Sequence, residues 1–399
     1  MNRVGWLILA SWPLAAMGQA PNPDLAPLPD TLASIETETR EAREAFSEAI
    51  EKSGKAASVA EIRAAINEQH ARLLSLMDRA LSLARLRPGE SEGLGAAAWA
   101  AIIAATERGD DVAERGDAAY RLLANAPALD ETAIFGAMAI APSLVLRCPE
   151  AESFLRAVIS RSRNPDLVAI ARCYLGFYLA EMARMRDRLD APVSGPEVAK
   201  ELTEVSLNRC RGLDAPKLRR EAEALLEQVI LEDAELGLNL GDSAAAELHR
   251  LRNLRIGQPA PELVGEDIDG APIRLSDFRG KVVVLMFWTT WSGSPSLVGG
   301  EKELIAAMEG RPFALVGVNG DAAEDRAGVK EAVAKEGFAW RSLWAGGPDG
   351  EIPRRWGVRS WPTVYTIDAD GTIRDDHVGG KLTLAAFEPL VRAAEETAR

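Results

Sequence analysis

The chain has 399 residues, a formal net charge of −14 at neutral pH, and a composition that is 47% hydrophobic but only 6% aromatic. This apolar content is sufficient to bury two or three cores of ordinary domain size, which excludes a chain that is disordered throughout. No run of five or six basic residues occurs. We therefore exclude nucleic acid and anionic membrane surfaces as main partners, because both bind clustered Lys and Arg.

Residues 1–20 have the pattern of a cleaved signal peptide. Arg3 supplies an early positive charge, Val4 to Met17 is predominantly apolar, and Gly18-Gln19-Ala20 places small residues at positions −3 and −1 of a cleavage site. As a helix, this apolar run would extend about 21 Å, short of the roughly 30 Å of a bilayer's hydrocarbon core. We favour cleavage over membrane anchoring, and predict a mature chain that begins at Pro21, does not span the membrane, and is periplasmic or secreted.

The region 31–254 is rich in Ala, Leu, Glu and Arg, and its apolar residues recur at helical spacing. This pattern predicts an all-helical region whose short connections join antiparallel helices, as in a solenoid. His70 lies on the apolar side of one long helix and is predicted to be a core or boundary residue, since no second ligand at metal-binding spacing accompanies it. That helix is predicted to end at Pro88-Gly89, and its apolar stripe is Ile62, Ile66, Leu73, Met77 and Leu81.

Three cysteines, Cys148, Cys173 and Cys210, are an odd number and a sparse set for an oxidising compartment. At most one internal disulfide can form among them, and the spacing leaves open which pair would form it and whether any of them is redox-active. Cys173 shares helical spacing with Ile170 and Phe177, which predicts a small buried hydrophobic residue.

From Arg255 onward, short apolar runs alternate with Gly, Pro and Asp-Gly turns. Val282 to Trp288 is apolar at every position, which is typical of a central strand buried on both faces. The alternation of strands and helices predicts an α/β domain over 257–399. The other predicted elements are a helix ending near Glu309, a strand at Phe313–Val318, a helix at Asp325–Lys335, a hairpin of strands Thr363–Ile367 and Thr372–His377, and a helix from Leu384.

Four motifs in this region occur in an order that identifies a family resemblance. They are Gly257-Gln258-Pro259-Ala260-Pro261, the stretch Leu275 to Val282, Phe287-Trp288-Thr289-Thr290-Trp291, and Trp361-Pro362-Thr363. Together they resemble exported thioredoxin-fold proteins of the TlpA-like or redoxin (AhpC/TSA) family. The resemblance covers 257–399 and implies a thioredoxin-like fold, an origin among thiol-disulfide oxidoreductases and peroxidases, and no cofactor. Members of this family often carry a helical N-terminal region, which agrees with 31–254.

The resemblance also shows what this chain lacks. The family motif Trp-Cys-x-x-Cys falls on Trp291-Ser292-Gly293-Ser294-Pro295, so Ser292 and Pro295 stand where the two redox cysteines would be. A serine cannot form a disulfide, and a helix dipole worth about 0.3 to 2 kcal/mol does not bring an alkoxide near neutral pH. Met286 stands where many thioredoxins have a buried Asp. We therefore expect no catalytic residue at these positions.

Ser292 is also a poor candidate for a hydrolase nucleophile. No Gly-x-Ser-x-Gly motif surrounds it, and the sequence gives no reason to place His377 beside it. The predicted role of Ser292 is to cap the N terminus of the following helix.

The binding part of the family site is retained. Pro362 matches the family's cis-proline, beside which an extended substrate peptide lies, and Trp288, Trp291 and Trp361 would frame an aromatic surface at the same position. This implies binding residues Trp291, Trp361 and Pro362 and an extended peptide or protein partner at the Trp361-Pro362 edge. The alternative interpretation is that the tryptophans are ordinary core and rim residues of the fold.

Three hypotheses for function follow. The leading one is an exported redoxin-like protein that lacks both redox cysteines and acts as a binding or assembly module. The second is a thiol-disulfide oxidoreductase or peroxidase of the same family that uses a displaced cysteine, namely Cys148, Cys173 or Cys210. The third is a structural helical array in which the redoxin-like domain is only a cap.

Overall fold

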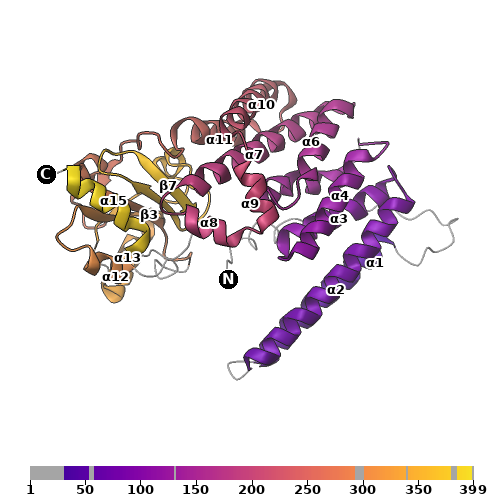
Figure 1. Ribbon diagram of the computed structural model, residues 1–399, viewed down its shortest axis with the longest axis horizontal. Helices are drawn as coiled ribbons and strands as arrows, with labels where there is room; N and C mark the ends of the chain where they lie inside the picture. The colour runs from indigo at the N-terminus through magenta and orange to yellow at the C-terminus, as the bar shows by residue number, and fades with distance from the viewer. Residues whose placement is uncertain are drawn as a thin grey trace. The chain divides into compact units, whose positions relative to one another are not determined.

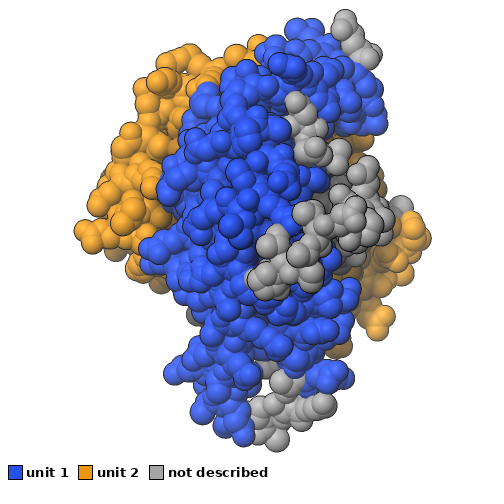
Figure 2. All heavy atoms as spheres, turned by 90° about the vertical axis from the view of Figure 1, so that its right-hand side faces the viewer, with its two compact units in different colours: residues 1–181, 228–240 blue, residues 182–227, 241–399 orange. Residues whose placement is uncertain are grey.

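The computed structural model describes residues 31–53, 58–129, 132–292, 301–337, 340–378 and 384–397. The predicted signal peptide and Pro295 lie outside the described residues. The chain forms two compact units, which Figure 2 distinguishes by colour: residues 1–181 with 228–240, and residues 182–227 with 241–399.

The first unit is helical, as predicted for this part of the chain, and no strand occurs among the described residues from 31 to 254. Helix α2 begins with a capping box, in which Ser58 Oγ accepts a hydrogen bond from Glu61 N at 3.2 Å and Glu61 Oε2 accepts one from Ser58 N at 2.9 Å. The helices, all but α5 labelled in Figure 1, are α1 (Leu32–Ser53), α2 (Val59–Leu86), α3 (Ser91–Thr106), α4 (Asp110–Asn125), α5 (Phe135–Ile140), α6 (Glu150–Arg161) and parts of α7 (Pro165–Asp190) and α10 (Ala215–Leu236).

The apolar stripe of α2 is buried along only part of the helix. Leu73, Met77 and Leu81 are buried, and α2 ends before Pro88-Gly89 as predicted, but Ile62 and Ile66 are 37% and 49% exposed. Helix α2 has 28 residues and α3 has 16, which correspond to lengths of about 42 Å and 24 Å. Because α3 is much shorter than α2, it cannot cover the whole stripe.

His70 and the three cysteines of the helical region have structural contacts or are buried in the core. His70 Nε2 lies 3.0 Å from Asp111 Oδ2, and this hydrogen bond lowers the pKa of Asp111. Cys148, Cys173 and Cys210 are buried and form no disulfide, which confirms the prediction that Cys173 is a buried residue.

The second unit is built on a five-stranded sheet of order β5-β4-β3-β6-β7. Strands β3 (Val282–Trp288), β4 (Phe313–Asn319) and β5 (Ser342–Trp344) are parallel, whereas β6 (Thr363–Ile367) and β7 (Ile373–Val378) run antiparallel to their neighbours. This mixed sheet confirms the predicted α/β, thioredoxin-like fold class. The remaining elements are α8 (Gly195–Glu201), α9 (Glu204–Arg211), α11 (Gly241–Asn253), β1 (Val264–Glu266), β2 (Pro272–Arg274), α12 (Glu301–Ala307), α13 (Arg326–Glu336), α14 (Glu351–Arg355) and α15 (Leu384–Thr397).

Strand β3 separates two apolar clusters, because successive side chains of a strand point to opposite faces of the sheet. Val284 and Met286 join a cluster that includes Phe387 of α15, whereas Leu285 and Phe287 join a cluster that includes the ring of Trp356. Every residue of β3 is buried, as its uninterrupted apolar sequence predicts.

A buried ionic network connects helical residues of the second unit to the sheet. Glu247 of α11, with a side chain 3% exposed, contacts Arg184 Nη2 at 2.7 Å, Arg250 Nη1 at 3.3 Å and Arg359 Nη1 at 2.7 Å. Burial alone would raise the pKa of Glu247, but the three arginines outweigh it and lower this pKa to about 2. Arg184 also lies 3.8 Å from Asp376 of β7.

The same network includes two neighbouring carboxylates of β7. Arg188 Nε donates to Asp376 Oδ1 at 3.0 Å, and Ser194 Oγ donates to Asp375 Oδ1 at 2.8 Å. Burial raises the pKa of Asp375 to about 6. Residues 182–227 and 241–254 precede the predicted domain 257–399 and belong to the same compact unit as the sheet, and Arg184 and Arg188 among them supply counter-charges to Asp376 of β7.

Candidate functional site

The candidate site lies at the carboxyl end of the inner strands β3 and β4, where three segments of the second unit meet. In the parallel pair of β3 and β4, Trp288 is in register with Asn319, and Gly320 N donates to Trp288 O at 2.9 Å. In the antiparallel pair of β3 and β6, Phe287 is in register with Thr363. The turn after β3, the residues after β4 and the residues before β6 are therefore neighbours.

The predicted binding residues Trp291, Trp361 and Pro362 lie together at this end of the sheet. The rings of Trp291 and Trp361 form an edge-to-face pair with centroids 6.4 Å apart. Trp291 is 59% exposed, Trp361 is half-buried, and Pro362 is buried. Contrary to the prediction, Trp288 does not belong to the aromatic surface, because it is 1% exposed in the core and its Nε1 donates to Ser342 Oγ at 2.7 Å. The Trp361-Pro362 peptide bond is cis, as the family resemblance implies. We call Trp291, Trp361 and Pro362 the tryptophan surface.

Gly320 allows the ring of Trp361 to lie against the main chain. A Cβ atom added at Gly320 would be 2.1 Å from Cη2 of Trp361, which is far inside van der Waals contact. A side chain at this position would displace the ring.

Ser292 has the hydrogen bonds of a turn residue. Its hydroxyl donates to the carbonyl oxygen of Thr289 at 3.1 Å, and its N–H donates to Thr289 Oγ1 at 3.3 Å. Within the part of the chain that the structure describes, no histidine or carboxylate hydrogen-bonds to Ser292 Oγ. The described site thus lacks the adjacent base that activates a nucleophilic serine. The predicted capping role stays a prediction, because residues 293–300 lie outside the described residues.

Asp321 is a site residue that sequence reasoning missed. Its carboxylate is only 1% exposed and accepts hydrogen bonds from Thr290 N at 2.9 Å, from Thr290 Oγ1 at 2.7 Å and from Asn319 Nδ2 at 2.7 Å. The available signal was the position of an acidic residue just past the end of a buried parallel strand, beside the motif that ends in Trp291.

Comparisons with known proteins concern the part of the chain that carries this site. A model of the AhpC/TSA family matches residues 256–376. Thiol-disulfide oxidoreductase ResA of Bacillus thuringiensis subsp. konkukian is 32% identical over 140 residues, which are 35% of this chain and 78% of that protein. The chain belongs to the AhpC/TSA family. Thioredoxin-like protein YneN of Bacillus subtilis is another relative, 30% identical over 31% of this chain and 71% of its own length.

Solved structures of similar proteins cover the same part of this AhpC/TSA family member. A putative thiol:disulfide interchange protein DsbE from Chlorobium tepidum has 30% sequence identity and a TM-score of 0.30, and the match covers 35% of this chain and 96% of that chain. Most of the helical part of the chain lies outside this match and outside the family model.

The three thiols of this protein lack the exposure that a reactive cysteine needs. Cys148, Cys173 and Cys210 are each at most 1% exposed, and burial raises the pKa of the Cys210 thiol. A reactive cysteine is instead partly exposed and has a lowered pKa. Met286, at the position of the family's buried Asp, is itself fully buried.

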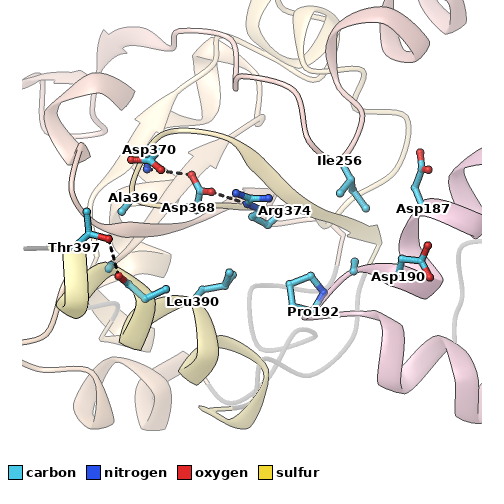
Figure 3. Close-up of a pocket in the computed structure, with 13 residues that line it drawn as sticks. Asp187, Asp190, Pro192, Ile256, Asp368, Ala369, Asp370, Arg374, Leu390 and Thr397 are labelled. Carbon is cyan, nitrogen blue, oxygen red and sulfur yellow. Dashed lines mark hydrogen bonds and ion pairs between the residues drawn. The ribbon is translucent and has the colours of Figure 1, made fainter.

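The second unit also contains a hollow of about 410 Å³, shown in Figure 3, which includes none of the predicted site residues. Two of the carboxylates that line it have basic partners within the same unit: Asp368 Oδ2 accepts from Arg374 Nε at 2.6 Å, and Asp187 Oδ2 accepts from Arg219 Nη1 at 2.6 Å. Among the described residues, no cluster of His, Cys, Asp and Glu is suited to a metal ion, and no helix is both long and apolar enough to cross a membrane.

Proposed function

We propose that the chain is an exported redoxin-like protein that lacks both redox cysteines and uses the tryptophan surface to bind an extended segment of a peptide or protein. The observation that carries this proposal is the combination of Ser292 at the motif position with an aromatic pair, the exposed Trp291 and the half-buried Trp361, beside a cis-proline. The helical region would act as a scaffold in assembly, and the signal-like residues 1–20 support export.

The loss of dithiol chemistry follows from the side chains at the motif. Disulfide exchange needs a thiolate that attacks a disulfide and a second thiol that resolves the mixed disulfide. Ser292 supplies neither, because its hydroxyl stays protonated at neutral pH and already donates to the Thr289 carbonyl. Pro295 has no functional group that could take the second role.

The proposed binding role rests on the exposed aromatic area. The side chain of Trp291 is 59% exposed, and the ring of Trp361 lies beside it. Tryptophan is enriched among the residues that contribute most to protein interfaces, since it buries a large rigid area and loses little conformational entropy. We propose an extended peptide rather than a compact small molecule, because the family resemblance places a substrate peptide beside the residue that precedes the cis-proline.

A peptide selection tests this role. A random peptide library would be selected on the wild-type protein and counter-selected on the double variant Trp291→Ala/Trp361→Ala, and each selected peptide would be labelled and titrated by fluorescence anisotropy. We expect Trp361→Ala to weaken binding at least tenfold, whereas Val264→Ala, which removes a 50% exposed apolar residue from β1, should leave it unchanged. Failure to enrich any peptide over the double variant would contradict the proposal.

A further inference from the structure

The tripeptide Asn319-Gly320-Asp321 contacts both segments that carry the tryptophan surface. It follows β4 directly and is hydrogen-bonded to the end of β3 through Gly320 N and Trp288 O. One of its residues lies under the ring of Trp361, and another holds the turn that carries Trp291. These two contacts come from adjacent residues of one rigid strand end.

Asp321 fixes the turn after β3. Thr290 donates to the Asp321 carboxylate through both its N–H and its hydroxyl, at 2.9 and 2.7 Å, so main chain and side chain of the residue before Trp291 are held together. Asn319 Nδ2 donates to Asp321 Oδ2, and Asp321 N donates to Asn319 Oδ1 at 3.2 Å. This reciprocal pair orients the carboxylate toward Thr290.

The burial of Asp321 makes this arrangement sensitive to substitution. A carboxylate that is 1% exposed is tolerated only where hydrogen bonds replace its lost hydration, and here three donors do so. An asparagine has nearly the same shape, and it can keep one oxygen toward Thr290 N and Asn319 Nδ2. Its NH2 group would then replace Oδ1, which accepts from Thr290 Oγ1 at 2.7 Å and from Thr290 N at 3.2 Å. The NH2 group cannot accept from Thr290 N, and the contact with the hydroxyl would lengthen to that of a neutral amide donor. The turn would then have to move away.

We infer that Asp321 is the positioning residue of the tryptophan surface, and that Gly320 completes its assembly by admitting the ring of Trp361. The positioning role stands on these contacts alone, and only the expected effect on peptide binding rests on the proposed function. Asp321 acts through Thr290 on the orientation of Trp291 and does not itself meet the ligand, since its carboxylate is buried.

Fluorine NMR of the full chain labelled with 5-fluorotryptophan reads the positions of the rings without any ligand. The resonances of Trp291, Trp361 and the distant Trp340 would be assigned by single Trp→Phe replacements. In Asp321→Asn we expect the Trp291 and Trp361 resonances to shift or broaden while that of Trp340 stays in place. Asp325→Asn, which alters an exposed acidic residue four positions further on, is the matched control and should shift neither.

Two further variants keep the test independent of whether Asp321→Asn folds. Thr290→Val removes one of the three hydrogen bonds and should shift the Trp291 resonance less than Asp321→Asn does. Gly320→Ala should shift the Trp361 resonance. Unchanged resonances in all three folded variants would overturn the inference, since a merely structural role lowers stability without moving the rings of the native state.

The peptide titration then separates the two proposals. If the resonances move and selected peptides bind Asp321→Asn about tenfold more weakly than Asp325→Asn, both proposals stand. If the resonances move but no peptide binds the wild type, the positioning role of Asp321 stands and the proposed function fails. If the rings move but the peptides bind Asp321→Asn and Asp325→Asn equally, the ring positions that Asp321 sets are not needed for binding, and the consequence of the inference for binding fails.

Discussion

Replacing Glu247 by Gln should destabilise the second unit strongly. Glu247 is the shared carboxylate partner of Arg184, Arg250 and Arg359, and its side chain is 3% exposed. Glutamine keeps the shape and one acceptor oxygen but removes the negative charge. Three arginines would then lie together without the carboxylate that they share, although Asp376 lies 3.8 Å from Arg184.

The size of this effect can be worked out in two ways. Removing one partner from a buried ion pair typically costs about 3 to 5 kcal/mol, because the remaining charge stays buried and uncompensated. Lowering the pKa of Glu247 from 4.5 to about 2 corresponds to about 3 kcal/mol of stabilisation by the charged form. Since the folded-state pKa is depressed, this contribution is present above pH 4.5 and is lost as the pH falls toward about 2.

Guanidinium chloride unfolding followed by tryptophan fluorescence measures the effect. Six of the nine tryptophans lie between residues 288 and 361, so the signal reports mainly on the second unit. The matched control is Glu223→Gln, which breaks a more exposed pair with Arg252 at 3.2 Å and should cost no more than about 1 kcal/mol. If Glu247→Gln costs no more than the control at pH 7, or if its cost does not shrink as the pH is lowered below 4.5, the reasoning is refuted.

Asp375→Asn should instead stabilise the protein at neutral pH. Burial raises the folded-state pKa of Asp375 from 3.8 to about 6, so the wild type loses stability as the pH rises through this range. Urea unfolding should show the variant more stable than the wild type by up to about 3 kcal/mol at pH 7 and no more stable at pH 3.5. Intact mass of the secreted protein should correspond to a chain beginning at Pro21, and a membrane-bound form that retains Met1 would instead support an anchor. Limited proteolysis tests the predicted junction between 31–254 and 257–399. Gly257 N donates to Ile373 O and Ala260 N donates to Gly371 O, so we expect this segment to resist cleavage. A stable C-terminal fragment of roughly 15 kDa would instead support the junction.

The sequence predicted those elements whose pattern is long and local. The apolar runs of β3, β4 and β6 and the terminal helix from Leu384 were placed within about two residues of their observed ends. The strands β1, β2 and β5 were missed because three residues are too few to show a periodicity. The exposure of Ile62 and Ile66 was missed because it depends on the length of neighbouring helices.

The candidate site was predicted in part for the same reason. Motif order brought Trp291, Trp361 and Pro362 together, but nothing local marks Asp321 as buried, since its partner Thr290 lies 31 residues earlier. The ionic network could not be predicted from the sequence either, because partners such as Arg188 and Asp376 are 188 residues apart. Polar contacts of this kind depend on the tertiary fold rather than on any pattern along the chain.

Reduction of insulin disulfides with dithiothreitol as electron donor tests the central claim, the loss of dithiol chemistry on a retained scaffold, most directly. The wild type should show no turnover above the dithiothreitol background, whereas Ser292→Cys/Pro295→Cys should gain measurable activity, which stays modest because Met286 offers no proton acceptor. Wild-type turnover that is abolished by replacing Cys148, Cys173 or Cys210, and not by Ser292→Ala, would contradict the claim and establish an enzyme with a displaced cysteine.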